Sequence, residues 1–223
     1  FAGLFGLLAV AEGQLSEDEP VTTVVPELSA SSAFREASFG QVLDMVNSMV
    51  FSEDYADPAS EIVQYGKALG WLEADRSERA ADSLYDYLVT LAKDPELEHG
   101  EVFNYQSAKT DVVNWVTNRA SGLSFQDTMH RVLWSKLGTS GETYVLLDRS
   151  GIPVAAGGLN TPPRDLARFA LMMLDGGRFD GQQVVPTSLI RELRAGASRE
   201  AFSRGSEAGG FMGGGDWSYR AQW

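Results

Sequence analysis

The segment with the clearest chemical potential is 103–111, which reads FNYQSAKTD. It places Tyr105 two residues before the hydroxyl of Ser107, at the expected start of a helix. A phenol near pKa 10 is a poor base at neutral pH, but an adjacent ammonium favours its phenolate. Such a phenolate could take a proton from a serine hydroxyl and return it to a leaving group. The alternative is structural: Tyr105 would be a half-buried aromatic residue and Ser107 a helix cap.

The composition of the 223-residue chain excludes several other kinds of site. There is no cysteine, so a disulfide framework, a thiolate metal site and a thiol nucleophile are excluded. His99 and His130 are too few for a His-rich zinc site, and we expect neither a metal nor another cofactor. The formal net charge of −13 argues against a general nucleic-acid binder. The glycines at 209–215 do not lie between a strand and a helix, so we interpret them as a flexible loop and not as a phosphate-binding loop.

The elements that must position Tyr105 are mostly helical. Apolar residues recur at helical spacing in segments that begin at or near Ser38, Leu84, Ser107 and Ser124. The period then changes to that of strands. Short runs at 143–147 and 153–156 flank a turn that contains Gly151, and this pattern predicts a β-hairpin.

The pattern along the chain favours one partial domain over 1–223. We expect a mainly helical region over 1–140, a β-hairpin over 141–160, and helices followed by the start of a strand over 161–223. This mixture is typical of an α+β layer fold. The apolar run at 1–11 is too short to cross a bilayer and predicts a buried core helix. That helix has no cap residue, so we expect that the chain begins inside it and that the true N-terminus is missing.

Residues 51–74 are interpreted as a candidate lid loop. The stretch has loop chemistry at Asp57-Pro58, Gly66 and Gly70, yet it holds the large aromatics Tyr55, Tyr65 and Trp71. Aromatic residues in a long loop often line a cleft, although packing of the loop on itself is the commoner explanation.

The order of segments resembles the serine β-lactamase and penicillin-binding protein superfamily. Within it, the class C-like branch with carboxylesterases and 6-aminohexanoate-oligomer (nylon-oligomer) hydrolases is the most similar. The stretches that carry the resemblance are FAGLFGLLAVAEG at 1–13, PV and VPEL within 20–28, VLDM at 42–45, EDYADPASE at 53–61, GW at 70–71, YQSAKTD at 105–111, GG and RDLAR within 157–168, and GQ and VP within 181–186. Each is weak alone, but their shared order over most of the chain is a strong signal. It implies a β-lactamase/transpeptidase-like fold, here a helical domain with part of an antiparallel sheet.

In that superfamily the nucleophile is the serine of an S-x-x-K motif, whose serine and lysine share one face of a helix. The 223 residues contain no S-x-x-K. The resemblance places this motif just before Phe1. It places a third motif, Lys-Thr-Gly or a His-Gly variant, after the strand expected to begin within 217–223. The chain is therefore expected to hold the second of three catalytic motifs.

Carried over residue by residue, the resemblance makes Tyr105 the general acid/base. Ser107 becomes its hydrogen-bonding neighbour, as in the nylon-oligomer hydrolases, where most class C-like relatives have Asn. Tyr55 corresponds to a loop tyrosine that closes over an amide substrate and hydrogen-bonds it. Trp71 corresponds to an aromatic residue of the pocket wall.

The function implied is that of a serine hydrolase that cleaves a small-molecule ester or amide through an acyl-enzyme. Gly66 and Ala156 stand where the family varies with substrate preference, and neither side chain can donate a hydrogen bond. Ester hydrolysis is therefore as well supported as hydrolysis of amide oligomers. Because no nucleophile motif is present, we expect the 223 residues alone to be inactive. The alternative is a non-catalytic binding or interaction module on the same fold. We expect no nucleic-acid partner and see no membrane span.

Overall fold

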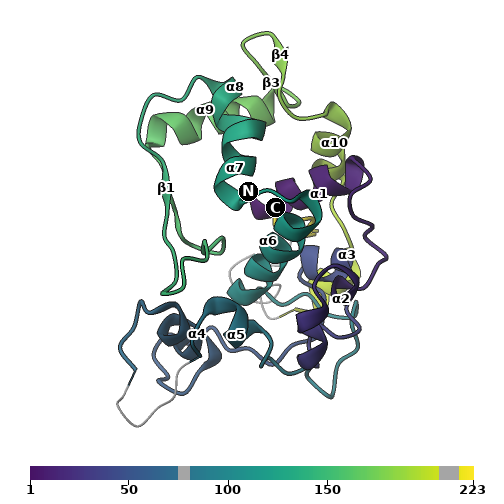
Figure 1. Cartoon of the computed structure of the whole chain (residues 1–223). Helices are drawn as coiled ribbons and strands as arrows, with labels where there is room; N and C mark the ends of the chain where they lie inside the picture. Colours follow the sequence, from purple (N-terminus) through teal and green to yellow (C-terminus); the bar gives the residue numbers. More distant parts are fainter. Residues whose placement is uncertain (75–80, 206–215) are drawn as a thin grey trace.

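The computed structural model describes residues 1–74, 81–205 and 216–223, and most of them lie in helices and their connecting loops (Figure 1). The α-helices are α1 (Ala2–Ala11), α2 (Val21–Val24), α3 (Phe39–Leu43), α4 (Glu61–Leu69), α5 (Leu84–Leu88), α6 (Ser107–Ser121), α7 (Phe125–Met129), α8 (Ser135–Leu137), α9 (Pro163–Leu174), α10 (Thr187–Ala195) and α11 (Arg199–Arg204). A 3₁₀-helix, η1 (Pro26–Ala30), and a π-helix, η2 (His130–Trp134), complete the helical elements of the described residues.

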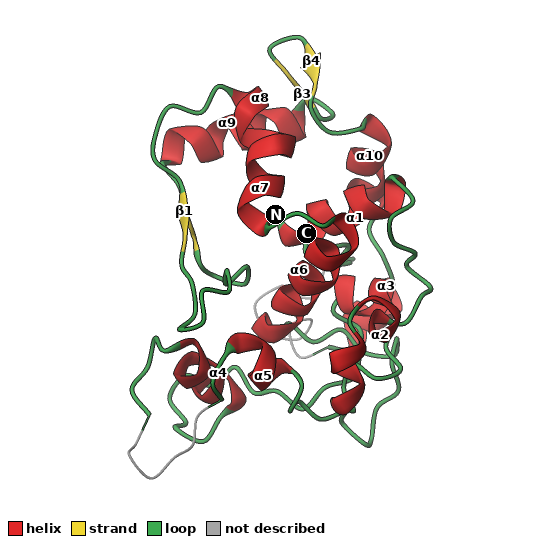
Figure 2. Cartoon of the chain, viewed as in Figure 1, coloured by secondary structure: helices red, strands yellow, loops and turns green. Residues whose placement is uncertain are grey.

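The strands of the described residues form two short antiparallel pairs (Figure 2). They are β1 (Tyr144–Val145) with β2 (Leu159–Asn160), and β3 (Arg178–Phe179) with β4 (Gln182–Gln183). In the first pair Tyr144 lies opposite Asn160, and a bridge between Leu147 and Pro153 lies nearer the turn. The hairpin therefore forms within 141–160, and its second arm reaches further along the chain than the predicted run at 153–156.

The core forms where α1 packs against α6, which runs through the middle of the molecule (Figure 1). Helix α1 is apolar on all sides and largely buried, which confirms the buried core helix predicted for 1–11. Its glycines allow close approach by other segments. A Cβ atom on Gly3 would lie 1.9 Å from the carbonyl oxygen of Ala221, and one on Gly6 would lie 3.0 Å from the ring of Phe39. Larger residues at Gly3 would therefore displace the backbone near residue 221.

Helix α4 corrects the interpretation of 51–74 as a loop. Ile62, Tyr65 and Leu69 are buried on one side of this helix, and Gly70 ends it in the left-handed conformation at φ 77°. Gly66 had suggested loop chemistry, but it lies inside the helix, where a Cβ atom would approach the Leu72 side chain to 2.8 Å. The segments on either side of α4 remain irregular.

The expectation of a strand in the C-terminal part is also wrong. The described residues of 217–223 form no strand: Ala221 and Gln222 have φ of 48° and 69°, and Arg220 and Trp223 exchange backbone hydrogen bonds in a tight turn. Positive φ at consecutive residues breaks the extended geometry of a strand. The residues before the glycine-rich stretch are helical, since α11 ends at Arg204. The glycines at 209–215 lie outside the described residues.

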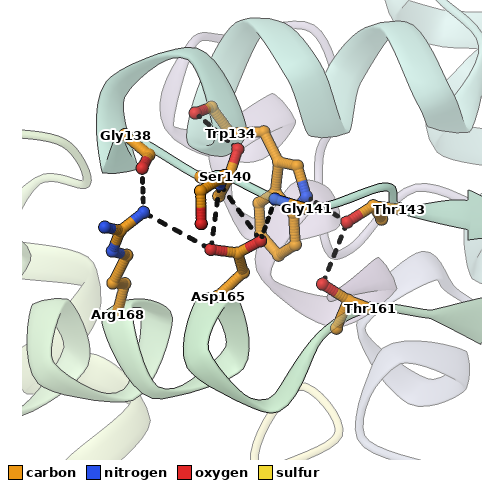
Figure 3. A network of polar contacts seen from close by, with 9 residues as sticks. Trp134, Gly138, Ser140, Gly141, Thr143, Thr161, Asp165 and Arg168 are labelled. Atoms are coloured by element: carbon orange, nitrogen blue, oxygen red, sulfur yellow. Dashed lines mark hydrogen bonds and ion pairs between the residues drawn. The ribbon is translucent and has the colours of Figure 1, made fainter.

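A polar network joins the start of α9 to the loop before β1 (Figure 3). The buried carboxylate of Asp165 accepts hydrogen bonds from the backbone N–H groups of Ser140 and Gly141, the latter at 3.0 Å. Nearby, the hydroxyls of Thr143 and Thr161 lie 2.9 Å apart. These contacts fix the approach of the hairpin to the helical region. No helix in the described part of the chain has both the length and the apolar character needed to cross a membrane.

Candidate active site

Tyr105 lies two residues before the start of α6, and its side chain is 45% exposed. The buried side chain of Gln106 holds this segment in place, because its Nε2 donates to the carbonyl oxygens of Met49 and Phe51 at 3.0 and 3.1 Å. Partial burial, followed by the charge of Glu53, raises the pKa of Tyr105. The phenol is therefore neutral at neutral pH, and it suits donation of a proton better than acceptance.

The buried ammonium group of Lys109 holds the backbone of the same segment by hydrogen bonds. This side chain is 0% exposed, and its Nζ donates to the carbonyl oxygens of Met45 and Asn104 at 3.0 and 3.2 Å. The backbone N–H of Asn104 also donates to the Met45 carbonyl, at 3.2 Å. Met45 has a φ of 58°, a conformation that costs about 1–3 kcal/mol in residues other than glycine. The strained turn after α3 is thus hydrogen-bonded to Asn104, the residue directly before Tyr105.

A cavity of about 350 Å³ lies between α4, the start of α6 and the segment at 156–157. Tyr55, Trp71 and Ser107 line it, so the structure brings together the three residues predicted to contact substrate. Gly66 and Ala156, the positions expected to vary with substrate preference, line the same cavity. Most of the remaining lining is apolar.

Tyr105 does not line this cavity. It lines a second one, of about 480 Å³, together with Glu53 and Gln106. Glu53 joins the two sites, since its carboxylate contacts both Ser107 and Tyr55 of the first cavity. Tyr105 is therefore next to the predicted substrate residues, because Glu53 lines its cavity and contacts two of them.

Glu53 is a site residue that the sequence interpretation missed. Its Oε1 accepts the backbone N–H of Ser107 at 2.6 Å, and its Oε2 accepts the hydroxyls of Tyr55 and Ser107 at 3.0 and 3.3 Å. It thus caps the start of α6, and Ser107 itself is the first residue of the helix and not its cap. Partial burial and then the Glu53 charge raise the pKa of Tyr55. An acidic residue two positions before Tyr55 was the only local signal.

Asp111 is a second residue to which no role was assigned, although it belongs to the motif at 105–111. Its carboxylate is fully buried and accepts the Tyr65 hydroxyl at 2.5 Å and the backbone N–H groups of Ala155 and Ala156 at 2.7 and 3.3 Å. Burial raises the pKa of Asp111 to about 7, and the hydrogen bonds that it accepts act in the opposite direction. Nothing in a single sequence indicates that the residues near 155 fold onto this helix.

Comparison with known proteins gives the geometry a family context. A family model described as beta-lactamase matches residues 1–222. A curated 6-aminohexanoate-dimer hydrolase of Paenarthrobacter ureafaciens is 39% identical to the chain over 216 residues, which cover 96% of the chain and 52% of that protein. The chain thus spans about half the length of this relative.

Solved structures agree with this match. A Bacillus anthracis protein proposed to be a 6-aminohexanoate-dimer hydrolase superposes with a TM-score of 0.83 and 25% identity, over 100% of this chain and 56% of that one. A D-stereospecific amidohydrolase from Streptomyces shares the fold, with a TM-score of 0.61 and 20% identity over 88% of this chain and 62% of that one. The fold is therefore β-lactamase/transpeptidase-like, as the order of the sequence motifs predicted, and the chain belongs to the beta-lactamase family.

Proposed function

We propose that the protein carrying these residues is a serine hydrolase that cleaves esters or small amides through an acyl-enzyme. Tyr105 would act as the general acid/base, and Tyr55, Ser107 and Trp71 would contact the substrate. The observation that carries the proposal is the single cavity that groups these three residues beside the segment of Tyr105. Membership of the beta-lactamase family and the similarity to a 6-aminohexanoate-dimer hydrolase support the reaction class.

The proposed reaction has two half-steps. A serine hydroxyl attacks the substrate carbonyl carbon, its proton passes to the neutral lysine of the same S-x-x-K motif, and backbone N–H groups stabilise the oxyanion. The bond to the leaving alcohol or amine then breaks, the phenol of Tyr105 donates its proton to that group, and the lysine ammonium reprotonates the phenolate. In the second half-step water attacks the acyl-enzyme, one of its protons is transferred to the serine oxygen, and the acid is released. The serine and its partner lysine would come from an S-x-x-K motif, which is absent from these 223 residues.

The cavity suits a short, largely apolar acyl or amide chain. Gly66 and Ala156 add no charge and no side-chain donor to its lining, while Trp71 and Ile62 supply apolar surface. Tyr55 is one lining residue that can donate a hydrogen bond to a substrate carbonyl: its hydroxyl donates to the Glu53 carboxylate, and a substrate could take the place of that acceptor. These features support esters as well as small amides.

A serine-directed acylating probe tests the proposal. The test compares the 223 residues alone with a longer natural polypeptide in which the same residues follow an S-x-x-K motif. We expect labelling and ester hydrolysis only in the longer polypeptide, because the chain has no such nucleophile of its own. Failure of the longer, folded polypeptide to label or to hydrolyse any ester or small amide would contradict the enzyme proposal. That result would favour the non-catalytic binding module.

Replacing Tyr55 with phenylalanine tests its contact with substrate. The side chain is 72% exposed, so we expect the free energy of unfolding to change by less than about 0.5 kcal/mol. Loss of one hydrogen bond to the substrate, worth about 1 kcal/mol, should lower kcat/KM for an amide about fivefold. An ester, whose carbonyl is a weaker hydrogen-bond acceptor, provides the internal control, and its kcat/KM should fall less. Equal losses on both substrates would argue against a specific contact with the amide.

A further inference from the structure

Two walls of the cavity meet at one buried carboxylate. Asp111 lies one helical turn after Ser107 on α6, so the two side chains share a face of the helix. Ser107 lines the cavity, and Asp111 lies fully buried behind it. The carboxylate is thus beside the proposed substrate site without facing it.

The hydrogen bonds of Asp111 go to two segments that are distant in sequence. Its Oδ2 accepts the hydroxyl of Tyr65, on α4, at 2.5 Å. Its Oδ1 accepts the backbone N–H groups of Ala155 and Ala156 at 2.7 and 3.3 Å. Tyr65 and Ala156 both line the cavity, on different walls. One carboxylate therefore ties both walls to α6.

We propose that Asp111 is a positioning residue of the substrate cavity: it clamps α4 and the 155–156 segment onto α6 and so sets the width of the cavity and its preference among substrates. The clamp follows from the hydrogen bonds of Asp111 alone, whereas its effect on substrates rests on the proposed hydrolase function. Charge-assisted hydrogen bonds are about twice as strong as neutral ones. The clamp is therefore strongest when the carboxylate is ionised, which favours measurements near pH 8, above its pKa of about 7.

The chain offers a closely matched control in Asp148. This aspartate is also buried, and it also accepts hydrogen bonds from backbone N–H groups, those of Leu84, Ser150 and Ile152, at 2.7 to 2.8 Å. Neither Asp148 nor these partners line the cavity. An Asp148→Asn variant therefore reports the cost of neutralising a buried carboxylate of this kind away from the substrate.

Hydrogen exchange tests the clamp without any catalytic readout. In Asp111→Asn at pH 8, amide exchange should rise about tenfold in peptides that cover α4 and 153–158, the ratio that corresponds to a weakened charge-assisted hydrogen bond. Tyr65→Phe should increase exchange at α4 and leave 153–158 unchanged, because it removes one branch of the clamp. Asp148→Asn should leave α4 unchanged and so serves as the control for that wall, because Asp148 also accepts the Ile152 N–H directly before 153–158. Unchanged exchange at both walls in Asp111→Asn would overturn the clamp.

Kinetics then test positioning in the polypeptide that carries the nucleophile motif, with p-nitrophenyl acetate and p-nitrophenyl hexanoate as probes. For Asp111→Asn, kcat/KM for the hexanoate should fall about tenfold and mostly through KM, while values for the acetate stay close to those of the parent. Asp148→Asn should keep the ratio between the two esters. Equal losses on both esters would overturn the positioning role. If the parent protein hydrolyses neither ester nor any small amide, the proposed function fails, and the exchange pattern alone decides the clamp.

Discussion

Replacing Tyr105 with phenylalanine is expected to lower kcat by about 100- to 10,000-fold, the usual contribution of a positioned general acid or base. The measurement requires a polypeptide in which these residues accompany the S-x-x-K motif. The substitution removes only the phenolic oxygen and keeps the ring. Because the side chain is 45% exposed, the free energy of unfolding should change by less than about 0.5 kcal/mol.

The control for Tyr105→Phe is Tyr144→Phe. Tyr144 is an exposed residue on β1 that lines neither cavity of the site. It should leave kcat near that of the parent. Since Tyr105 is proposed to protonate the leaving group, its loss should be smaller for esters with very acidic leaving groups, which depart without a proton. A Tyr105→Phe variant that retained most of its kcat on an unactivated amide would show that another group transfers the proton.

Much of the helical scaffold could be predicted from local patterns. Ser38 and Ser124 were expected to precede helices, and each accepts a hydrogen bond from the backbone N–H three residues later. The helix after Tyr105 follows from apolar spacing alone, and α6 begins at Ser107 as expected. Local patterns predicted the wrong element at Gly66, because glycine occurs both in loops and at tightly packed positions within helices. Gly66 was read as a loop residue, although its lack of a side chain serves the close packing of Leu72.

The residues of the site also divide into those that the sequence could indicate and those that it could not. Motif order indicated Tyr105, Tyr55, Ser107 and Trp71, and the structure groups the last three in one cavity. Motif order could not indicate Glu53 as the common partner of Tyr55 and Ser107, because the hydrogen bond to Ser107 spans 54 positions in the sequence. Contacts at such separation depend on the tertiary fold, and a single sequence carries no direct record of them. The same reason explains why Asp111 received no role.

The C-terminal turn shows how a distant ion network supports the site. The guanidinium of Arg220, 7% exposed, pairs with the carboxylates of Glu17, Asp44 and Glu192. Asp44 ends α3, and the next residue is the strained Met45, whose carbonyl accepts from Lys109. The positive φ values that prevent a strand at 221–222 also allow the Ala221 N–H to donate to Asp44 at 2.8 Å. The network therefore fixes the turn on which the Tyr105 segment rests.

Arg220→Met is accordingly expected to destabilise the folded chain strongly. Removing one partner of a buried ion pair costs about 3–5 kcal/mol, because a charge is left buried and unpaired. Glu17 and Glu192 are partly exposed and can turn toward solvent, so Asp44 should carry most of the penalty. We expect a loss of about 3 kcal/mol at pH 7, measured by chemical denaturation, and a lower kcat through the displaced 44–46 turn.

A matched control and a pH series separate this network from an ordinary loss of surface charge. Arg204→Met removes an exposed ion pair with Glu200 on α11 and should cost no more than about 0.5 kcal/mol.

Burial raises the pKa of Asp44, while the Ala221 N–H and Arg220 oppose that rise. Without Arg220 the pKa of Asp44 must rise further, so the variant binds a proton more tightly than the parent does. The stability deficit of Arg220→Met should therefore be largest at neutral pH and shrink as the pH falls through the raised pKa of Asp44 in the variant, reaching its minimum below the pKa of Asp44 in the parent, where the carboxyl is protonated in both proteins. A deficit that stays constant over this range would place the role of Arg220 in packing and not in charge.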